Sequence, residues 1–311
     1  MIKNINEKKI AAFISIISNV TLTLLKFIVG YVSGSISIIS EVLHSLSDLL
    51  ASLIAFFAIN KSSRPPDSRY EFGYNKYEDL SGLIEGLLII LASIYIVYES
   101  VNKIFFTQNN SFNSSYGIIV MLIAIIVNIL VSKYLFIVAK RNNSIALFAD
   151  AEHLRTDIYT SVSVMLALVA IKFTNIYIID PIIAIIVSLL IFKAGYKICQ
   201  KTIKNLLDES LPIEEKEKII KIVEKYISKD VVNHICKLRT REAGGKKEIE
   251  IIICMNENLT IKQGHIICDK IESDIKSAIG NSEVIIHMEP ICKMCLNKNK
   301  KNLINTKQIK Y

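Results

Sequence analysis

Two apolar segments repeat one pattern of metal-binding side chains. His44 precedes Asp48 by four residues, and His153 precedes Asp157 by the same interval. This spacing places the imidazole and the carboxylate of each pair on one face of a helix, one turn apart. Two such faces brought together offer two imidazoles and two carboxylates, a donor set that suits a tetrahedral divalent metal such as zinc.

Both pairs lie in segments long enough to span a membrane, where ionisable side chains are costly and usually functional. For one segment alone, a polar pair that only joins helices is a competing interpretation. The chain has five histidines, however, so chance would rarely place both patterns in apolar segments.

Glu41 and Asp150 each precede a histidine by three residues on the same helical face. We expect them to line the cytosolic access to the site or to support its ligands.

The composition indicates a polytopic membrane protein with a soluble C-terminal part. The chain has 311 residues, 51% of them hydrophobic, and a formal net charge of +8, with a mean hydropathy of +0.41. The apolar residues are concentrated before about residue 200. The lysines lie mainly at membrane flanks and in the terminal tail rather than among aromatic residues, so no nucleic-acid partner is expected.

Six membrane spans are predicted from the apolar segments. Basic residues gather in the loop 61–76 and at 140–141, so the positive-inside rule places both termini, these loops and the C-terminal part in the cytosol. No removable signal peptide is expected, because the polar residues 1–9 precede an apolar run long enough to span. The predicted spans cover residues 10–32, 36–59, 80–101, 115–138, 145–172 and 177–199.

The C-terminal part is predicted to form a small α+β domain. Amphipathic helices at 212–226 and 260–279 alternate with strands at 234–241, 247–255 and 283–287, and Ala243-Gly244-Gly245 indicates a hairpin turn. The order α-β-β-α-β suits a ferredoxin-like antiparallel sheet with helices on one face. The predicted organisation is a six-helix transmembrane domain at 1–206, a cytosolic ferredoxin-like domain at 207–291, and a basic, disordered tail at 292–311.

With these motifs the chain resembles the cation diffusion facilitators, a family of proton-coupled divalent metal exporters, and most closely the ferrous-iron and zinc efflux type. The resemblance covers nearly the whole chain, and the paired motifs on the second and fifth spans are its most specific part. It is also carried by Gly34-Ser-Ile-Ser-Ile-Ile-Ser, Phe72-Gly-Tyr-Asn-Lys76, Asp180-Pro181, Leu206-Leu-Asp208 and Val284-Ile-Ile-His287.

The resemblance implies a transport site, a partner and a location. The site would consist of the side chains that match the family ligands, which are His44, Asp48, His153 and Asp157. The protein would be a homodimer joined through its cytosolic domains, with Lys76 paired to an acid at the position of Asp208. It would be a multi-pass protein of the bacterial inner membrane.

The ligand set resembles that of the zinc-selective members of the family. We therefore expect Zn²⁺ as the transported substrate and as a cytosolic regulatory ion, with protons as the exchanged ion and no organic cofactor. Divalent affinities overlap, so Fe²⁺, Co²⁺, Cd²⁺ and Mn²⁺ remain alternatives.

The chain departs from the family pattern at two further metal sites. A loop site built from one Asp and two His in some members reads Asp67, Tyr70 and Tyr74 here, so we expect it to be lost. The two-metal cytosolic cluster is altered as well, which favours a single, partly thiolate site. Its predicted ligands are Cys236, His265, His287 and Glu289.

Two cysteine observations remain open. Cys292-x-x-Cys295 is equally compatible with a metal clip and with an incidental solvated pair. His234 lies close to Cys236 in the sequence, but we expect it to point to the opposite face of its strand.

No nucleotide-binding or catalytic motif is present, so the energy for transport is expected from an ion gradient and the protein is not expected to be an enzyme. Two rival interpretations stay open. One is an intramembrane metalloenzyme, in which an open coordination position activates water. The other is a metal sensor that does not transport.

Overall fold

The computed structural model describes residues 2–33, 36–106, 115–174, 178–228 and 231–290, and within these ranges the side chains of some helical residues are not described. Cys292, Cys295 and the predicted tail lie outside the described residues. The chain divides into two compact units, Met1–Leu207 and Asp208–Tyr311.

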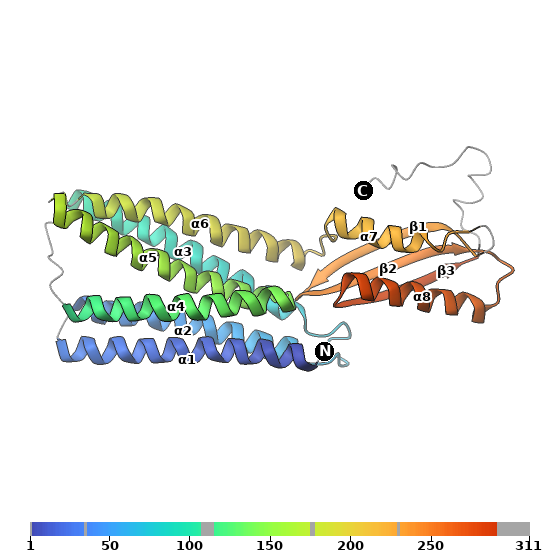
Figure 1. The fold of residues 1–311 in the computed structure, drawn as a ribbon, viewed down its shortest axis with the longest axis horizontal. Helices are drawn as coiled ribbons and strands as arrows, with labels where there is room; N and C mark the ends of the chain where they lie inside the picture. Colours follow the sequence, from blue (N-terminus) through green and yellow to red (C-terminus); the bar gives the residue numbers. More distant parts are fainter. Residues whose placement is uncertain (1, 34–35, 107–114, 175–177, 229–230, 291–311) are drawn as a thin grey trace. The chain divides into compact units, whose positions relative to one another are not determined.

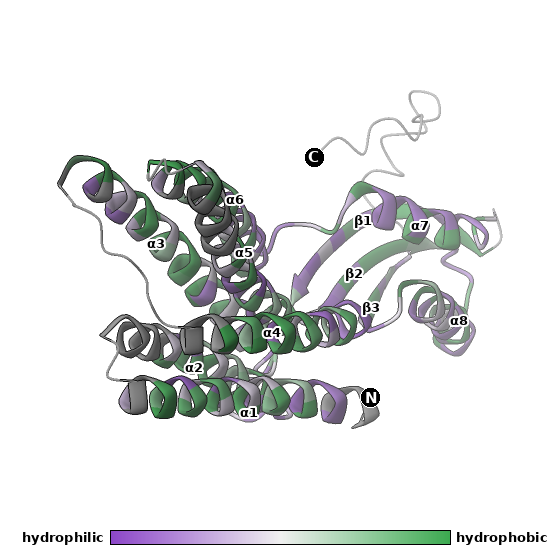
Figure 2. Cartoon of the chain, turned by 60° about the vertical axis from the view of Figure 1, so that its left-hand side comes forward, coloured by the Kyte–Doolittle hydropathy of each residue, from purple (hydrophilic) through white to green (hydrophobic). Residues whose placement is uncertain are grey.

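Six long helices form the first unit and lie side by side (Figure 1). Large apolar side chains cover much of their outer surface, among them Leu91, Leu130 and Leu189, and green predominates along α4 in the hydropathy view (Figure 2). Such a surface suits lipid rather than water. The helices are α1 (Ile2–Ser33), α2 (Ile36–Ser62), α3 (Lys76–Phe106), α4 (Ser115–Asn142), α5 (Ile145–Thr174) and α6 (Ile179–Leu206).

Four of these helices are long and apolar enough to cross a membrane when the described residues are considered. They are α1, α3, α4 and α6, through Asn6–Val29, Lys76–Asn102, Leu122–Asn142 and Pro181–Leu206. The other two, α2 and α5, carry the two His-x-x-x-Asp pairs, and part of each lies among the side chains that are not described.

Helix α5 connects the two apolar clusters of this unit. One cluster joins α5 to α1, α2 and α4 through residues such as Leu135, Leu147 and Leu154. The other joins α5 to α3 and α6 through Ile89, Ala149 and Ile198. Any side chain that α5 directs inward is therefore surrounded by protein.

Helices α3 and α6 approach each other closely because glycines face the contact. A Cβ added at Gly195 would lie 2.9 Å from the carbonyl oxygen of Gly86, and a Cβ at Gly86 would lie 2.7 Å from the Cys199 Sγ. Asn205 adds a hydrogen bond from its side-chain amide to Asp79, at 2.9 Å. Small residues at a helix contact are the usual means of close packing in a membrane.

Within its described residues, the second unit contains two helices and a three-stranded sheet in the predicted order α-β-β-α-β. The core takes residues from both helices and from all three strands, and along 249–255 and 284–288 core residues alternate with residues on the other face of the sheet. Both helices therefore cover the same face of the sheet. The purple and green bands of α7 and α8 in Figure 2 reflect this one-sided packing. The elements are α7 (Ile213–Glu224), β1 (Val232–Ala243), β2 (Lys246–Met255), α8 (Ile261–Ile279) and β3 (Ser282–Glu289).

Local sequence signals explain the ends of these elements. Gly244 and Gly245 both have positive φ, 56° and 78°, as the tight hairpin between β1 and β2 requires. Thr260 begins α8 with a capping box: its hydroxyl accepts a hydrogen bond from the Gln263 backbone amide, and the Gln263 side chain accepts one from the Thr260 backbone amide.

The prediction of an antiparallel sheet is wrong for one strand pair. Strands β1 and β2 are antiparallel, but β2 and β3 are parallel, in the order β1-β2-β3. The reason is the connection, because α8 carries the chain back along the sheet before β3 begins, and such a crossover joins parallel strands.

We expect Gly195→Ala to destabilise the helical unit by about 1–3 kcal/mol, because the added methyl group would overlap the Gly86 backbone. Thermal unfolding of the purified protein measures the effect. Ile186→Phe is the control, since it adds more volume on the same helix at a side chain that is 57% exposed. Equal loss in both variants would contradict close packing at Gly195.

Candidate metal site

Helices α2 and α5 bring three of the four predicted transport ligands together. The His153 Nε2 lies 3.1 Å from the Asp48 Oδ1, and each of Asp48, His153 and Asp157 offers one ligand atom within 4.8 Å of the other two. Ligand atoms about 2.1 Å from a tetrahedral metal lie about 3.4 Å from one another. The spacing thus suits one shared ion with little rearrangement.

His44 lies on α2 one turn before Asp48, and Glu41 lies three residues before His44. The side chains of both residues are outside the described part of the chain. Their assignments, as fourth ligand and as access or supporting group, remain predictions.

Asp150 occupies a buried polar cluster beside the three ligands. Its Oδ1 accepts a hydrogen bond from the Ser52 hydroxyl at 3.2 Å. The Asn19 amide donates to the same hydroxyl at 2.5 Å and lies 3.5 Å from the Asp48 carbonyl oxygen. Helices α1, α2 and α5 are thereby linked next to the ligands. Asp150 is fully buried, which fits a supporting group better than an exposed access group.

Ser52 is the supporting residue that the sequence interpretation missed. It lies four residues after Asp48, so it continues the face of α2 that carries His44 and Asp48. Extending the four-residue spacing by one turn would have found it.

The burial of His153 argues against a purely structural polar pair. Only 8% of its side chain is exposed, and its Nδ1 has no hydrogen-bond partner among the described residues. Histidines that only stabilise a core usually have both nitrogens satisfied. Two carboxylates beside this imidazole supply the charge that a divalent ion needs in a site of low dielectric.

The loop between α2 and α3 uses its acidic residue for a hydrogen bond. The Tyr74 hydroxyl donates to the Asp67 Oδ2 at 2.5 Å, and the backbone amides of Arg69 and Tyr70 donate to the Oδ1 at 2.9 Å. The Tyr74 bond lowers the pKa of the Asp67 carboxyl and raises that of the Tyr74 hydroxyl. The carboxylate thus stabilises the loop, and the expected loss of a metal site there remains a prediction.

The structure does not gather the four predicted cytosolic ligands within one chain. Cys236 lies on β1, and His287 and Glu289 lie on β3, on the sheet face opposite the helices. His265 lies on α8, where it is exposed and 3.6 Å from Asp269. The assignment of these four residues as one site remains a prediction.

Lys76 and Asp208, the predicted dimer interlock, belong to different units. The Lys76 Nζ donates to the Leu206 carbonyl oxygen at 3.3 Å. Within the second unit, the Asp208 Oδ2 lies 3.2 Å from the Arg241 guanidinium, which also donates to Glu248 at 2.5 Å. The interlock remains a prediction, and Arg241 would compete for Asp208.

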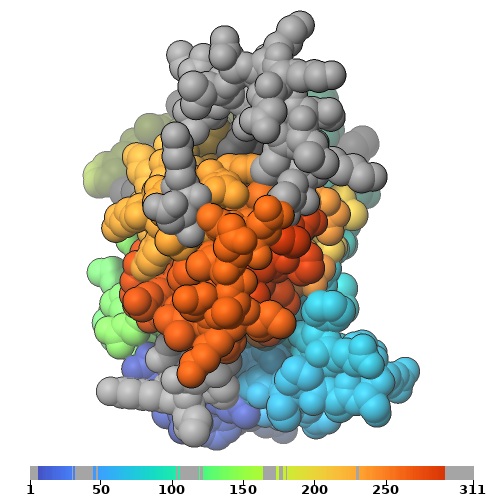
Figure 3. Space-filling model, turned by 90° about the vertical axis from the view of Figure 1, so that its right-hand side faces the viewer, coloured from blue at the N-terminus to red at the C-terminus, as the bar shows by residue number. Residues whose placement is uncertain are grey.

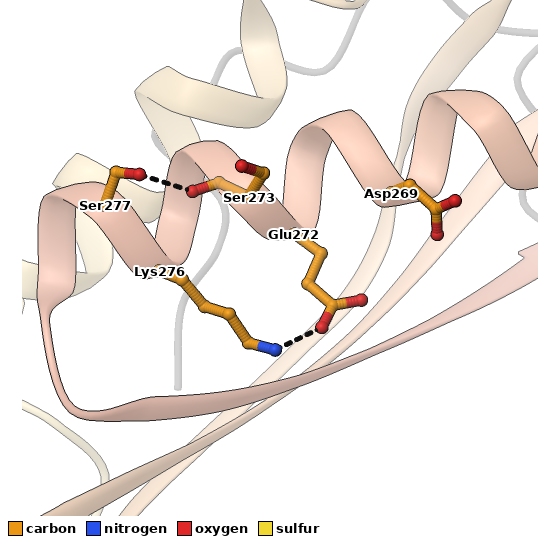
Figure 4. Close-up of a pocket in the computed structure, with 5 residues that line it drawn as sticks. All are labelled: Asp269, Glu272, Ser273, Lys276 and Ser277. Carbon is orange, nitrogen blue, oxygen red and sulfur yellow. Dashed lines mark hydrogen bonds and ion pairs between the residues drawn. The ribbon is translucent and has the colours of Figure 1, made fainter. Parts of the chain in front are cut away.

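An open hollow along α8 offers no comparable site (Figure 4). Lys276 pairs there with Glu272 one turn earlier, and the Ser277 hydroxyl donates to the Ser273 carbonyl at 2.8 Å. The outer surface of this region, orange in the space-filling view, faces the viewer in Figure 3. These are the contacts of a solvated helix face.

Apolar helices of membrane-crossing length around converging imidazole and carboxylate donors are the features of a membrane transporter for metal cations. The comparisons with known proteins agree with this class. Residues 12–207 match the family model of the cation efflux transmembrane domain, and residues 211–291 match that of the cation efflux protein cytoplasmic domain. The chain therefore belongs to the cation efflux family, the cation diffusion facilitators.

Two relatives illustrate the similarity. An uncharacterized transporter of Synechocystis is 34% identical over 260 residues, which are 84% of this chain and 83% of the relative. The cation-efflux pump FieF of Shigella boydii is 27% identical over 91% of this chain and 93% of its own length. Family membership makes this chain a multi-pass membrane transporter for divalent cations, with a cytoplasmic dimerisation domain, and not an enzyme.

We expect Asp157→Asn to weaken metal binding at least tenfold, because the amide keeps the shape of the side chain but removes one ligand charge. Isothermal titration of the detergent-solubilised protein with Zn²⁺ measures the loss. Glu152→Gln makes the same chemical change on α5 at a carboxylate that pairs with Arg155 at 2.9 Å. Equal weakening in both variants would contradict the assignment of Asp157.

We expect Tyr74→Phe to lower the melting temperature at neutral pH, with a difference from the wild type that shrinks on acidification. The folded pKa of Asp67 is lowered, so its contribution is complete above the ordinary carboxyl pKa and is lost as pH falls through the lowered value. Melting curves over a pH series measure this. Tyr98→Phe, at an exposed tyrosine, is the control, and a pH-independent difference in Tyr74→Phe would contradict the expectation.

Proposed function

We propose that this protein exports Zn²⁺ from the cytoplasm in exchange for protons, through a tetrahedral site formed by His44, Asp48, His153 and Asp157. The observation that carries the proposal is the convergence of Asp48, His153 and Asp157 from two helices. Each of these helices bears the same His-x-x-x-Asp spacing. The same spacing on α2 supports His44 as the proposed fourth ligand.

The proposal includes six membrane spans. Helices α2 and α5 have 27 and 30 residues, enough to cross a hydrocarbon core of about 30 Å at a rise of about 1.5 Å per residue. Both pack among the four helices that are apolar enough to span. Asp48 on α2 and His153 on α5 are buried in protein rather than exposed on the outer surface of the unit.

The orientation and the assembly follow from the same proposal. The basic loop 61–76 and the pair 140–141 lie on the cytosolic side, with both termini, in a bacterial inner membrane. The ferredoxin-like cytosolic unit joins two copies of the chain. Lys76 and Asp208 lock the dimer near the membrane surface.

Zinc is preferred because two imidazoles and two carboxylates match its tetrahedral coordination. Fe²⁺, Co²⁺ and Cd²⁺ accept similar donors, and Mn²⁺ favours sites richer in oxygen. The ion is the substrate, so the site has to release it as well as bind it.

Exchange with protons follows from the donors themselves. Imidazole and carboxylate bind a metal only when deprotonated, so metal binding releases protons and acid on the far side displaces the metal. In the buried site, protons or a cation must offset the charge of the carboxylates at every stage.

We expect Zn²⁺ flux in proteoliposomes to follow an imposed pH gradient and to collapse when a protonophore dissipates it. Asp157→Ala should abolish the coupled flux, because the site loses a ligand and a charge. Glu152→Gln, reconstituted at the same density, should transport normally. Flux of Asp157→Ala equal to the wild type would contradict the proposed site, and flux indifferent to pH would contradict proton exchange.

A further inference from the structure

A second group of metal-binding side chains lies in the C-terminal unit, separate from the helical site. His234, Cys236 and Cys254 each offer one ligand atom, and the three atoms lie within 4.8 Å of one another. Neither cysteine forms a disulfide with a described residue. The sequence interpretation placed His234 on the opposite face from Cys236. That was wrong, because side chains two residues apart in a strand point to the same face.

Two irregularities in β1 assemble this group. The pairing of β1 with β2 shifts between Val232 and His234 and again between Ile235 and Lys237. Each shift is a bulge, at which two residues of β1 oppose one residue of β2.

The bulges change the spacing of the side chains that face the helices. Val232, Ile235 and Leu238 belong to the apolar core, at intervals of three residues instead of two. The two residues inside each interval therefore point to the outer face of the sheet. His234 lies inside the first interval and Cys236 inside the second, and His234 lies directly opposite Cys254.

The distances suit a tetrahedral ion. The Cys236 Sγ lies 3.7 Å from the His234 Nε2. With metal–sulfur bonds of about 2.3 Å and metal–nitrogen bonds of about 2.0–2.1 Å, tetrahedral geometry separates ligand atoms by about 3.5–3.8 Å. Two thiolates and one imidazole favour Zn²⁺, Co²⁺ or Cd²⁺ over Mg²⁺, Ca²⁺ or Mn²⁺.

The surroundings of Cys254 also favour a ligand. Its Sγ lies 3.9 Å from the Asn233 side-chain amide, a donor that would support a thiolate by a weak hydrogen bond. As a protonated thiol, Cys254 donates to the Pro290 carbonyl oxygen at 3.8 Å. Cys254 is buried, whereas His234 and Cys236 are partly exposed, so an ion could approach from the solvent side. Cys268 differs, because burial in the apolar core raises the pKa of its thiol to about 11.

We propose that His234, Cys236 and Cys254 form a thiolate metal site for a borderline or soft divalent cation, with a fourth position open to solvent. The site shares only Cys236 with the cytosolic set predicted from the sequence. It contains sulfur, whereas the helical site offers only nitrogen and oxygen donors. The proposal therefore stands or falls independently of the proposed transport function.

Cobalt distinguishes the two kinds of site in the intact protein. Co²⁺ bound by thiolates gives a charge-transfer absorption in the near ultraviolet, which imidazole and carboxylate ligands do not give. We expect the full chain in detergent to develop this band on titration with Co²⁺, and Cys236→Ser and Cys254→Ala each to lose it. His234→Ala should lower the Co²⁺ affinity at least tenfold.

Two controls separate this site from other thiols. Cys268→Ala should keep the band, and so should the double variant Cys292→Ser/Cys295→Ser, because neither change touches the three ligands. Circular dichroism confirms that each variant is folded. If Cys254→Ala is unfolded, the cobalt band of Cys236→Ser alone tests the proposal. A missing band in the wild type, a band retained in Cys236→Ser, or a band lost only in the tail double variant would overturn the proposal.

Discussion

The contact between His153 on α5 and Asp48 on α2 is the constraint on which the helical unit depends. Both side chains are about nine-tenths buried, and ionised groups removed from water lose solvation free energy that only close partners restore. The site therefore cannot be both empty and fully charged, since the carboxylates need either a cation or protons. Under the proposed function, this requirement would tie metal occupancy of the site to its protonation before any movement of helices is considered.

Helix α5 holds that contact in place because it belongs to both apolar clusters of the unit. On one side it packs with α1, α2 and α4, and on the other with α3 and α6, which are joined to each other at Gly86 and Gly195. The two helix groups also meet where the Ser62 hydroxyl of α2 donates to Glu78 of α3 at 2.9 Å. Because α5 belongs to both groups, a shift between them would still act on the contact between His153 and Asp48. The proposed ligands thus lie where a rearrangement of the bundle would alter their geometry.

Much of this arrangement could be predicted from the sequence, because four-residue spacing in an apolar segment specifies both the helix and the face on which His153 and Asp157 lie. The glycine pair at 244–245 specified the hairpin in the same local way. The direction of β3 and the grouping of Cys254 with His234 could not be predicted from local sequence signals of this kind. They depend on a crossover helix and on two bulges in β1, and neither the pairing partner nor an extra residue in a ladder leaves a local signal.

The two donor sets differ in a way that separates their chemistry. Asp48, His153 and Asp157 offer hard and borderline donors, from which protons displace a metal readily. Cys236 and Cys254 would bind the same ion through sulfur, with slower release and stronger preference for soft cations. If the cytoplasmic site fills first as metal rises, it stabilises the sheet at the bulged end of β1 while the transport site still turns over. Under the two proposals, an ion retained in the cytoplasmic unit and released from the helical unit would let the protein respond to the metal that it exports.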